Sequence, residues 1–132
     1  MNPEGMTTSP SSFGPKETMD RLVAAVTRRG MTVLARIDHA GAAATAGLTL
    51  RPTEVLIFGN PRAGTPLMQA VQSTGIDLPL KALTWQDEAG RTWLGYNDPQ
   101  WLARRHRAEA GADRVLEAMT DALEAVAKEA AG

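Results

Sequence analysis

The sequence predicts an α+β domain built as a two-layer sandwich, with helices packed on a mixed β-sheet and an extra C-terminal helix. Stretches with apolar residues at helical spacing alternate with short β-branched runs. Their order is helix, strand, small helix, strand, helix, two strands, helix, helix. A chain of 132 residues, 43% of them hydrophobic, can bury one self-sufficient core. We therefore expect a single domain over residues 13–132, preceded by a lead-in.

The first half of the chain supplies the first helix, two strands and a small helix. Residues 1–12 are rich in Ser, Thr, Pro and Gly and are expected to form a flexible lead-in with room for one short strand. Gly14-Pro15 opens the first helix, because proline suits the first helical position, and Gly30 ends it. Strands are predicted at 31–38 and 54–58, and a short helix at 40–47.

The second half supplies a hairpin and three helices. Thr65 is the expected N-cap of a helix that begins with Pro66. Strands at 80–86 and 91–96 form a hairpin that places Trp85 beside Trp93. A helix follows Asp98-Pro99, and the last helix spans about 112–130. The apolar stripe of this last helix is buried either against its own sheet or against a partner chain, and the sequence does not distinguish these two arrangements.

Charge and composition exclude several functions. The formal net charge is −1, with 14 basic and 15 acidic residues, so no strong field attracts nucleic acid. The absence of cysteine excludes disulfides, thiolate nucleophiles and cysteine metal sites. There is neither a signal-like N-terminus nor an apolar run of membrane-spanning length. We expect a cytoplasmic protein without nucleic-acid or membrane partners.

Four segments carry a family resemblance when they are taken in order. They read Ala35-Arg36-Ile37-Asp38-His39-Ala40, then Leu56-Ile57-Phe58-Gly59-Asn60-Pro61 with Gly64-Thr65-Pro66-Leu67-Met68, then Asp77-Leu78-Pro79-Leu80-Lys81, then Trp93, Tyr96-Asn97-Asp98-Pro99 and Leu102 to Arg105-His106. This pattern resembles the bacterial and archaeal family called domain of unknown function 302, over about residues 14–107. The resemblance implies a compact α+β fold and a homodimer, and it implies no reaction. The weak first strand and the C-terminal helix after Gly111 depart from the pattern.

The loop from Gly59 to Gly64 has the spacing of a phosphate-binding P-loop. The lysine that should follow is missing, because Thr65-Pro66 stands there. The favoured interpretation is a strand-to-helix turn that needs glycine dihedrals and a threonine cap. A weak anion site at the helix N-terminus is the alternative, with Asn60 and Thr65 as ligand-binding candidates.

The two histidines are the strongest candidates for chemistry. His39 and His106, with Asp38, could hold a metal ion if the fold brings them together, but their spacing does not require it. The plainer interpretation is that His39 hydrogen-bonds a turn and His106 favours the end of its helix. We therefore predict no metal site, and the sequence leaves any cofactor unknown.

A pocket is a further hypothesis for the polar residues at element ends. Asp38, His39, Lys81, Tyr96 and Arg105 could line one pocket, in which His39 is the base, Asp38 orients it and a cation holds an anionic substrate. Surface ion pairs and caps are the plainer interpretation of each residue. Lys81, Tyr96, Arg105 and His106 are kept as ligand-binding candidates.

The sequence contains no complete catalytic motif. We therefore favour a small dimeric binding or accessory module for a small, possibly anionic, ligand. The alternatives are an enzyme that uses the His39/Asp38 pair with Lys81 or Arg105, a metal site of His39 and His106, and a purely structural interaction protein. Neither the ligand nor the reaction follows from the sequence.

Overall fold

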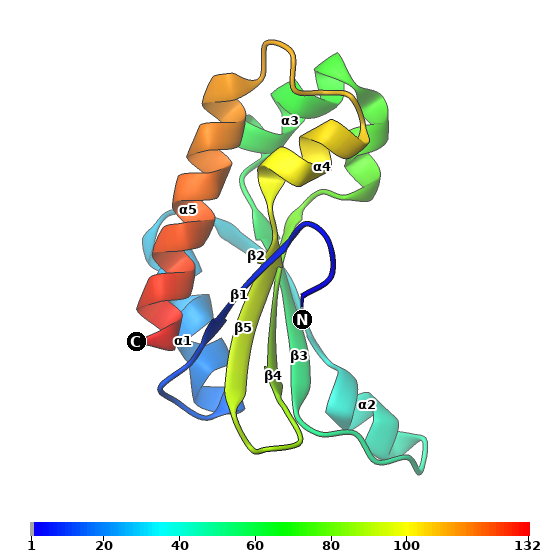
Figure 1. Ribbon diagram of the computed structural model, residues 1–132, viewed down its shortest axis with the longest axis vertical. Coiled ribbons are helices and arrows are strands. Elements are labelled where there is room, and N and C mark those ends of the chain that lie inside the picture. Colours follow the sequence, from blue (N-terminus) through cyan, green and yellow to red (C-terminus); the bar gives the residue numbers. More distant parts are fainter. Residues whose placement is uncertain (1) are drawn as a thin grey trace.

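The computed structural model describes residues 2–132, which fold into one sheet with two long helices on one of its faces (Figure 1). The fold is α+β, as the sequence predicts. The strands are β1 Met6–Pro10, β2 Thr32–Asp38, β3 Thr53–Gly59, β4 Leu80–Gln86 and β5 Thr92–Asn97. The helices are α1 Pro15–Arg28, α2 His39–Thr45, α3 Pro61–Ala70, the 3₁₀ helix η1 Gln72–Ile76, α4 Pro99–Arg105 and α5 Asp113–Ala131.

The sheet has the order β1-β5-β4-β3-β2, and every neighbouring pair of strands is antiparallel. The expectation of a mixed sheet is therefore wrong in this detail. A parallel pair needs a crossover that carries the chain back to the starting end of the sheet. Here α2 links β2 to β3, and α3 with η1 links β3 to β4, so that each connection returns the chain at the end where it left. The predicted pair of Trp85 with Trp93 is confirmed in the register of β4 and β5.

One face of the sheet is buried under α1 and α5. Alternate residues of the central strands point into this layer and are almost fully buried, among them Leu56, Phe58, Leu80 and Leu94. The helices fill the layer from the other side with Met19, Leu22 and Val26 of α1 and Met119, Leu123 and Val126 of α5. The C-terminal helix thus packs on its own domain, which settles the question that its apolar stripe left open.

The opposite face of the sheet is apolar and only partly buried. Side chains that stand opposite one another in neighbouring strands share a face, and the register places these residues on this second face: Ala35, Ile37, Val55, Ile57, Leu83, Trp85 and Trp93. All of them keep some exposure. We call this set the open face. In the described residues 2–132, no helix packs over it (Figure 1).

Three local predictions need correction. Residues 6–10, assigned to the flexible lead-in, form the edge strand β1, because pairing with the backbone of β5 outweighs their polar side chains. The third helix begins at Pro61 rather than Pro66, and Asn60 caps it in place of Thr65, since the Asn60 side chain accepts a hydrogen bond from the Arg62 N–H. The 3₁₀ helix η1 was not foreseen.

Two glycines with the same backbone geometry provide a stability test. Gly5 has a φ of +80°, and a Cβ there would overlap the ring of Trp101, whereas Gly90 has a φ of +83° and open space around it. We expect Gly90→Ala to lower the free energy of unfolding by about 1 kcal/mol, the cost of left-handed backbone. We expect Gly5→Ala to cost about 3 kcal/mol, because the ring must also move. Urea denaturation of the two variants measures this difference, and equal losses would contradict the packing of Trp101 on the N-terminal turn.

Candidate functional site

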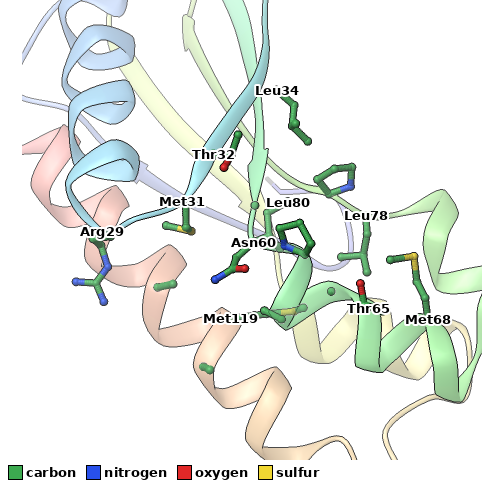
Figure 2. A pocket seen from close by; sticks show the side chains of 17 residues that line it. Arg29, Met31, Thr32, Leu34, Asn60, Thr65, Met68, Leu78, Leu80 and Met119 are labelled. Atoms are coloured by element: carbon green, nitrogen blue, oxygen red, sulfur yellow. The ribbon is translucent and has the colours of Figure 1, made fainter.

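The main cavity of the described chain is a groove of about 600 Å³ at one end of the sheet. It lies where β2 begins, where β3 passes into α3, and where the middle of α5 crosses (Figure 2). Its lining is mostly apolar and includes Met31, Leu34, Pro61, Ala63, Met68, Leu78, Pro79, Leu80, Ala118, Met119 and Ala122. A volume of this size is in the range of pockets that hold small organic molecules.

A few polar groups border this groove. Arg29, Thr32, Asn60 and Thr65 contribute to its lining, and Figure 2 shows Arg29 at the α1 end, with Met68 and Leu78 near α3. Arg29 is exposed and forms no ion pair with any residue in 2–132. The oxygen of the Asn60 side chain is used in capping α3, which leaves its amide nitrogen for other partners. The groove therefore combines an apolar body with a cationic end.

The P-loop spacing has a different structural role from the one expected. Gly59 ends β3 and Gly64 lies within α3, and neither has a positive φ. The interpretation that this segment needs glycine dihedrals is therefore wrong. A Cβ on Gly64 would stand 3.6 Å from the side chain of Leu78, in ordinary contact. The segment supplies one wall of the groove. Asn60 and Thr65, two of the residues predicted to bind a ligand, both line it.

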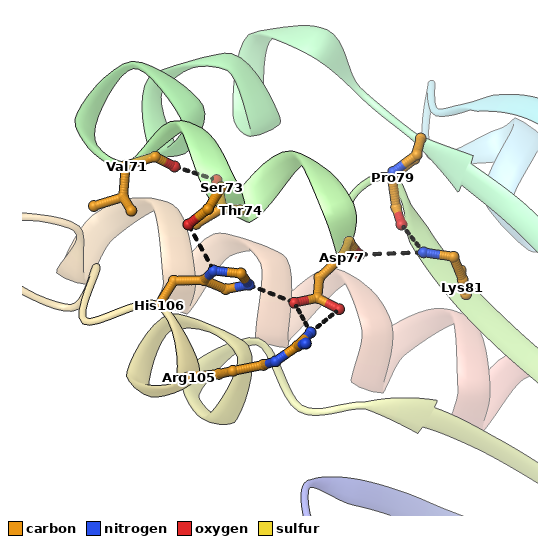
Figure 3. A network of polar contacts seen from close by, with 8 residues as sticks. All are labelled: Val71, Ser73, Thr74, Asp77, Pro79, Lys81, Arg105 and His106. Atoms are coloured by element: carbon orange, nitrogen blue, oxygen red, sulfur yellow. Dashed lines mark hydrogen bonds and ion pairs between the residues drawn. The ribbon is translucent and has the colours of Figure 1, made fainter.

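A second polar cluster connects η1 to the end of α4 (Figure 3). The Nδ1 atom of His106 lies 2.8 Å from the Ser73 hydroxyl, and its Nε2 atom lies 2.5 Å from Asp77 Oδ2. One guanidinium nitrogen of Arg105 donates to both oxygens of Asp77, at 2.8 and 2.7 Å. The side chains of His106 and Asp77 are 8% and 16% exposed, so the hydrogen bond between these two residues is largely shielded from water.

The charge of Asp77 fixes the orientation of this cluster. Burial alone would raise the pKa of Asp77, but the hydrogen bonds from His106 and Arg105 more than offset it, and the pKa lies below its ordinary value. A carboxylate can only accept a hydrogen bond, so Nε2 of His106 donates to it. In a neutral His106, Nδ1 is then the acceptor, and the Ser73 hydroxyl donates to it.

A hydroxyl, an imidazole and a carboxylate in series are the groups of a serine nucleophile with its base. Catalysis also needs a space beside the hydroxyl for the reacting carbonyl. Ser73 is not among the residues that line the groove, and the small cavity next to His106, of about 10 Å³, lies against buried residues. The arrangement therefore fits a clamp that holds η1 against α4.

The remaining sequence candidates lie apart from one another. Asp38 caps α2 through the Gly41 N–H, and the neighbouring His39 is exposed on α2. The Nζ atom of Lys81 donates to the carbonyls of Asp77 and Pro79. Tyr96 points into the helix layer, where burial, and then Glu124 and Asp98, raise the pKa of its hydroxyl. The structure brings Arg105 and His106 together on Asp77, but no hydrogen bond or ion pair joins His39 to them.

The geometry gives no support to a metal ion shared by the two histidines. Both ring nitrogens of His106 are engaged, by Ser73 and Asp77. Within residues 2–132, no group of three His, Asp or Glu side chains could hold a metal ion. His39 is the first residue of α2, whereas His106 follows α4.

Sequence reasoning missed the residues that give both clusters their character. Asp77 entered only as part of a family segment, and Ser73 and Arg29 were not considered as site residues. Asp77 follows η1 and precedes Pro79 at a chain reversal, and its position after a polar turn was a usable signal. For Ser73 and the groove methionines, spacing offers no signal, because the fold alone brings them to their partners.

The fold and the groove define a small α+β domain with a groove of ligand size. The model of the family described as "Domain of unknown function DUF302" matches residues 7–126. The chain belongs to this family. The match includes β1 and most of α5, so the first strand and the C-terminal helix are part of the family pattern, which extends beyond residues 14–107 at both ends.

A solved structure has the same fold, and curated proteins match the chain in sequence. A crystal structure of an uncharacterised DUF302 protein from Bacillus stearothermophilus superposes with a TM-score of 0.84 at 22% identity, and the alignment covers 97% of this chain and 99% of that one. Two curated relatives are each 45% identical over 97% of this chain: "Fluoride-specific ion channel FluC 1" of Brucella suis and "Fluoride-specific ion channel FluC 2" of Brucella melitensis. The chain spans about half the length of these relatives, 50% and 47%. In residues 2–132, no helix combines the length and the apolar character needed to cross a bilayer.

The clamp at Asp77 predicts a pH-dependent contribution to stability. The folded-state pKa of Asp77 is lowered, so its contribution is complete above the unfolded pKa of about 4 and is lost as the pH falls through the folded value. We expect Asp77→Asn to lower the free energy of unfolding by about 2 kcal/mol at pH 7 and by much less at pH 3. Urea denaturation at the two pH values measures this. The exposed Asp121→Asn is the control, and an equal loss for Asp77→Asn at both pH values would contradict the role of the carboxylate charge.

Proposed function

We propose that this chain is a binding module for a small organic molecule, which it holds in the groove between β2, α3 and α5. The observation that carries the proposal is the combination of an apolar groove of about 600 Å³ with Arg29 at one end, which is exposed and has no ion pair within residues 2–132. Sites for small molecules are typically apolar clefts in which a few polar groups fix the orientation of the ligand. No complete catalytic arrangement adjoins this groove, which favours binding over turnover.

The lining suggests the chemistry of the ligand. Three methionines, Met31, Met68 and Met119, form adaptable apolar walls that suit a flat or branched hydrocarbon body. The guanidinium of Arg29 suits a carboxylate, sulfonate or phosphate at the end of that body. The small, possibly anionic, ligand expected from the sequence thus becomes an amphipathic anion.

Two further parts of the proposal come from the sequence. The family resemblance implies a homodimer, and the composition led us to expect a cytoplasmic protein. A dimer would present two grooves, one in each copy. We propose both properties together with the groove, as expectations that mass measurement and cell fractionation can test.

The relatives named as fluoride channels suggest where such a module acts. A channel must cross the membrane, and in residues 2–132 of this chain no helix is suited to that. In those relatives the other half would form the pore, and the matched half would be an accessory domain. Fluoride itself does not suit the groove, because a small hydrated anion would lose its water to apolar walls. We propose that the ligand bound in the groove regulates such a channel and does not pass through it.

An amphipathic dye tests the groove directly. The probe 8-anilinonaphthalene-1-sulfonate combines an aromatic body with one negative charge, and its fluorescence rises in an apolar site. We expect saturable binding by the native protein. Arg29→Gln should weaken it about tenfold, because a charge-assisted hydrogen bond is lost. Ala118→Trp, which places a large ring in the groove, should abolish it.

Each variant has a matched control outside the groove. Arg114→Gln removes an exposed arginine of α5, and Ala70→Trp adds a ring at the exposed end of α3. Both should bind the dye as the native protein does. Ile57→Lys, on the open face, separates the groove from that apolar surface and should also leave binding unchanged. If Ala118→Trp binds normally while Ile57→Lys does not, the dye site lies on the open face and the groove proposal is wrong.

A further inference from the structure

We propose that the open face of the sheet is the contact surface for a second copy of this chain, and that α2 and the residues after it form an arm that packs on the partner. This inference goes beyond the groove and gives the expected homodimer a defined surface. It rests on the unequal covering of the two sheet faces, on the exposure of the arm and on the size of the open face.

The open face lacks a cover that its composition requires. The residues of the buried face, such as Leu56 and Leu94, are about 1% exposed or less, whereas Ile37 on the open face is 39% exposed. Lys81 stands beside the open face in the register, but its Nζ atom already donates to two carbonyls. Charged groups meet the face at Trp93, where Arg91 lies over the ring and Asp87 accepts a hydrogen bond from the indole. The rest of the face is apolar and suits an apolar partner rather than a nucleic acid or an acidic peptide.

The segment 39–50 is little covered by the rest of the described chain, in which α2 contacts β3. None of the seven residues of α2 is buried, and Leu48 and Leu50, which follow it, are 67% and 47% exposed. Figure 1 shows α2 projecting away from the α1 and α5 layer. A helix this short is not stable by itself in water, because nucleation costs more than so few hydrogen bonds return. We call residues 39–50 the arm.

The size of the open face indicates that the arm takes part in the contact. The open face spans four strands, β2 to β5; at a spacing of about 4.8 Å and about six residues each, they present roughly 380 Å². A stable interface buries about 800 Å² on each partner. The sheet alone falls short of this value, and the exposed apolar side chains of the arm can supply the difference.

A two-fold axis satisfies both surfaces at once. In a symmetric dimer the same patch serves on both copies, so a contact of arm to sheet is made twice. Each arm then covers apolar sheet surface of the other copy, and each sheet receives the cover that its own chain lacks. A different protein could cover the sheet, but that arrangement would not account for the exposed apolar side chains of the arm.

Mass measurement on the full chain tests this proposal. Light scattering with size exclusion should give twice 14.1 kDa for the native protein. Ile57→Lys, in the middle of the open face, should give the monomer mass. Ala24→Lys places the same charge on the exposed side of α1 and should remain dimeric. The double variant Leu48→Asp with Leu50→Asp should also shift the mass towards the monomer, because it places charges on the arm.

Two further readouts keep the test decisive. Circular dichroism reports whether Ile57→Lys folds, and Ile37→Lys, at a more exposed position of the same face, replaces it if it does not. Hydrogen exchange on dilution should rise in the arm and in β3 and β4 together. A native monomer would overturn the proposal, as would a dimer that survives the sheet variants. The dye titration is independent, so loss of the dimer with retained dye binding separates this surface from the groove.

Discussion

The packing of α1 against α5 over one face of the sheet is the constraint on which the rest of the molecule depends. The two helices meet through buried apolar residues, and their ends are also tied by polar contacts. Arg21 of α1 donates to the carbonyls of Ala130 and Glu129, and the Ser12 N–H donates to the carbonyl of Ala131. Segments more than a hundred residues apart in the sequence are thereby joined directly. Because all the long helices lie in this layer, the other face of the sheet remains without one.

The position of the groove follows from this layer. The chain leaves β3 beside the middle of α5, and α3 fills the corner beyond the sheet. The clamp of Asp77 on Arg105 and His106 then holds the segment from η1 to β4 in place, which positions Leu78 and Pro79 as a wall. The polar network thus supports the apolar site without contributing a functional group to it. The half-exposed ion pair of Arg105 with Asp77 and the shielded hydrogen bond of His106 are more useful for orientation than for net stability.

Local sequence signals predicted the elements but not the contacts between them. The apolar stripe of α5, the Trp85 and Trp93 pair and the Asp98-Pro99 cap all depend on neighbours within one element or hairpin, and the structure has them as expected. The strand order does not depend on local spacing, and so the antiparallel sheet was missed. The start of α3 was misplaced because two Asx or Thr caps, each followed by proline, stand five residues apart, and propensity does not choose between them.

The candidate site was less predictable than the helices and strands, because its residues come together only through contacts between elements. Family segments drew attention to Asn60, Arg105 and His106, and the structure places Asn60 in the groove and the other two in the clamp. Asp38 and His39 looked like an acid–base pair because they are adjacent in sequence. In the structure Asp38 caps α2, and His39 is exposed on that helix. Arg29 and the groove methionines come from four separate elements and their ends, so only the folded chain unites them.

The methionines of the groove give it a chemical sensitivity that the rest of the domain lacks. The chain has six methionines and no cysteine, and three of the six line this one cavity. In a protein with cysteine, oxidants react first with the thiol; in this chain the thioethers of methionine are the sulfur groups that can react. Conversion of Met31 or Met68 to the sulfoxide would add a polar, chiral oxygen to an apolar wall. Exposure to peroxide would then close the groove to an apolar body, and methionine sulfoxide reductases would restore it.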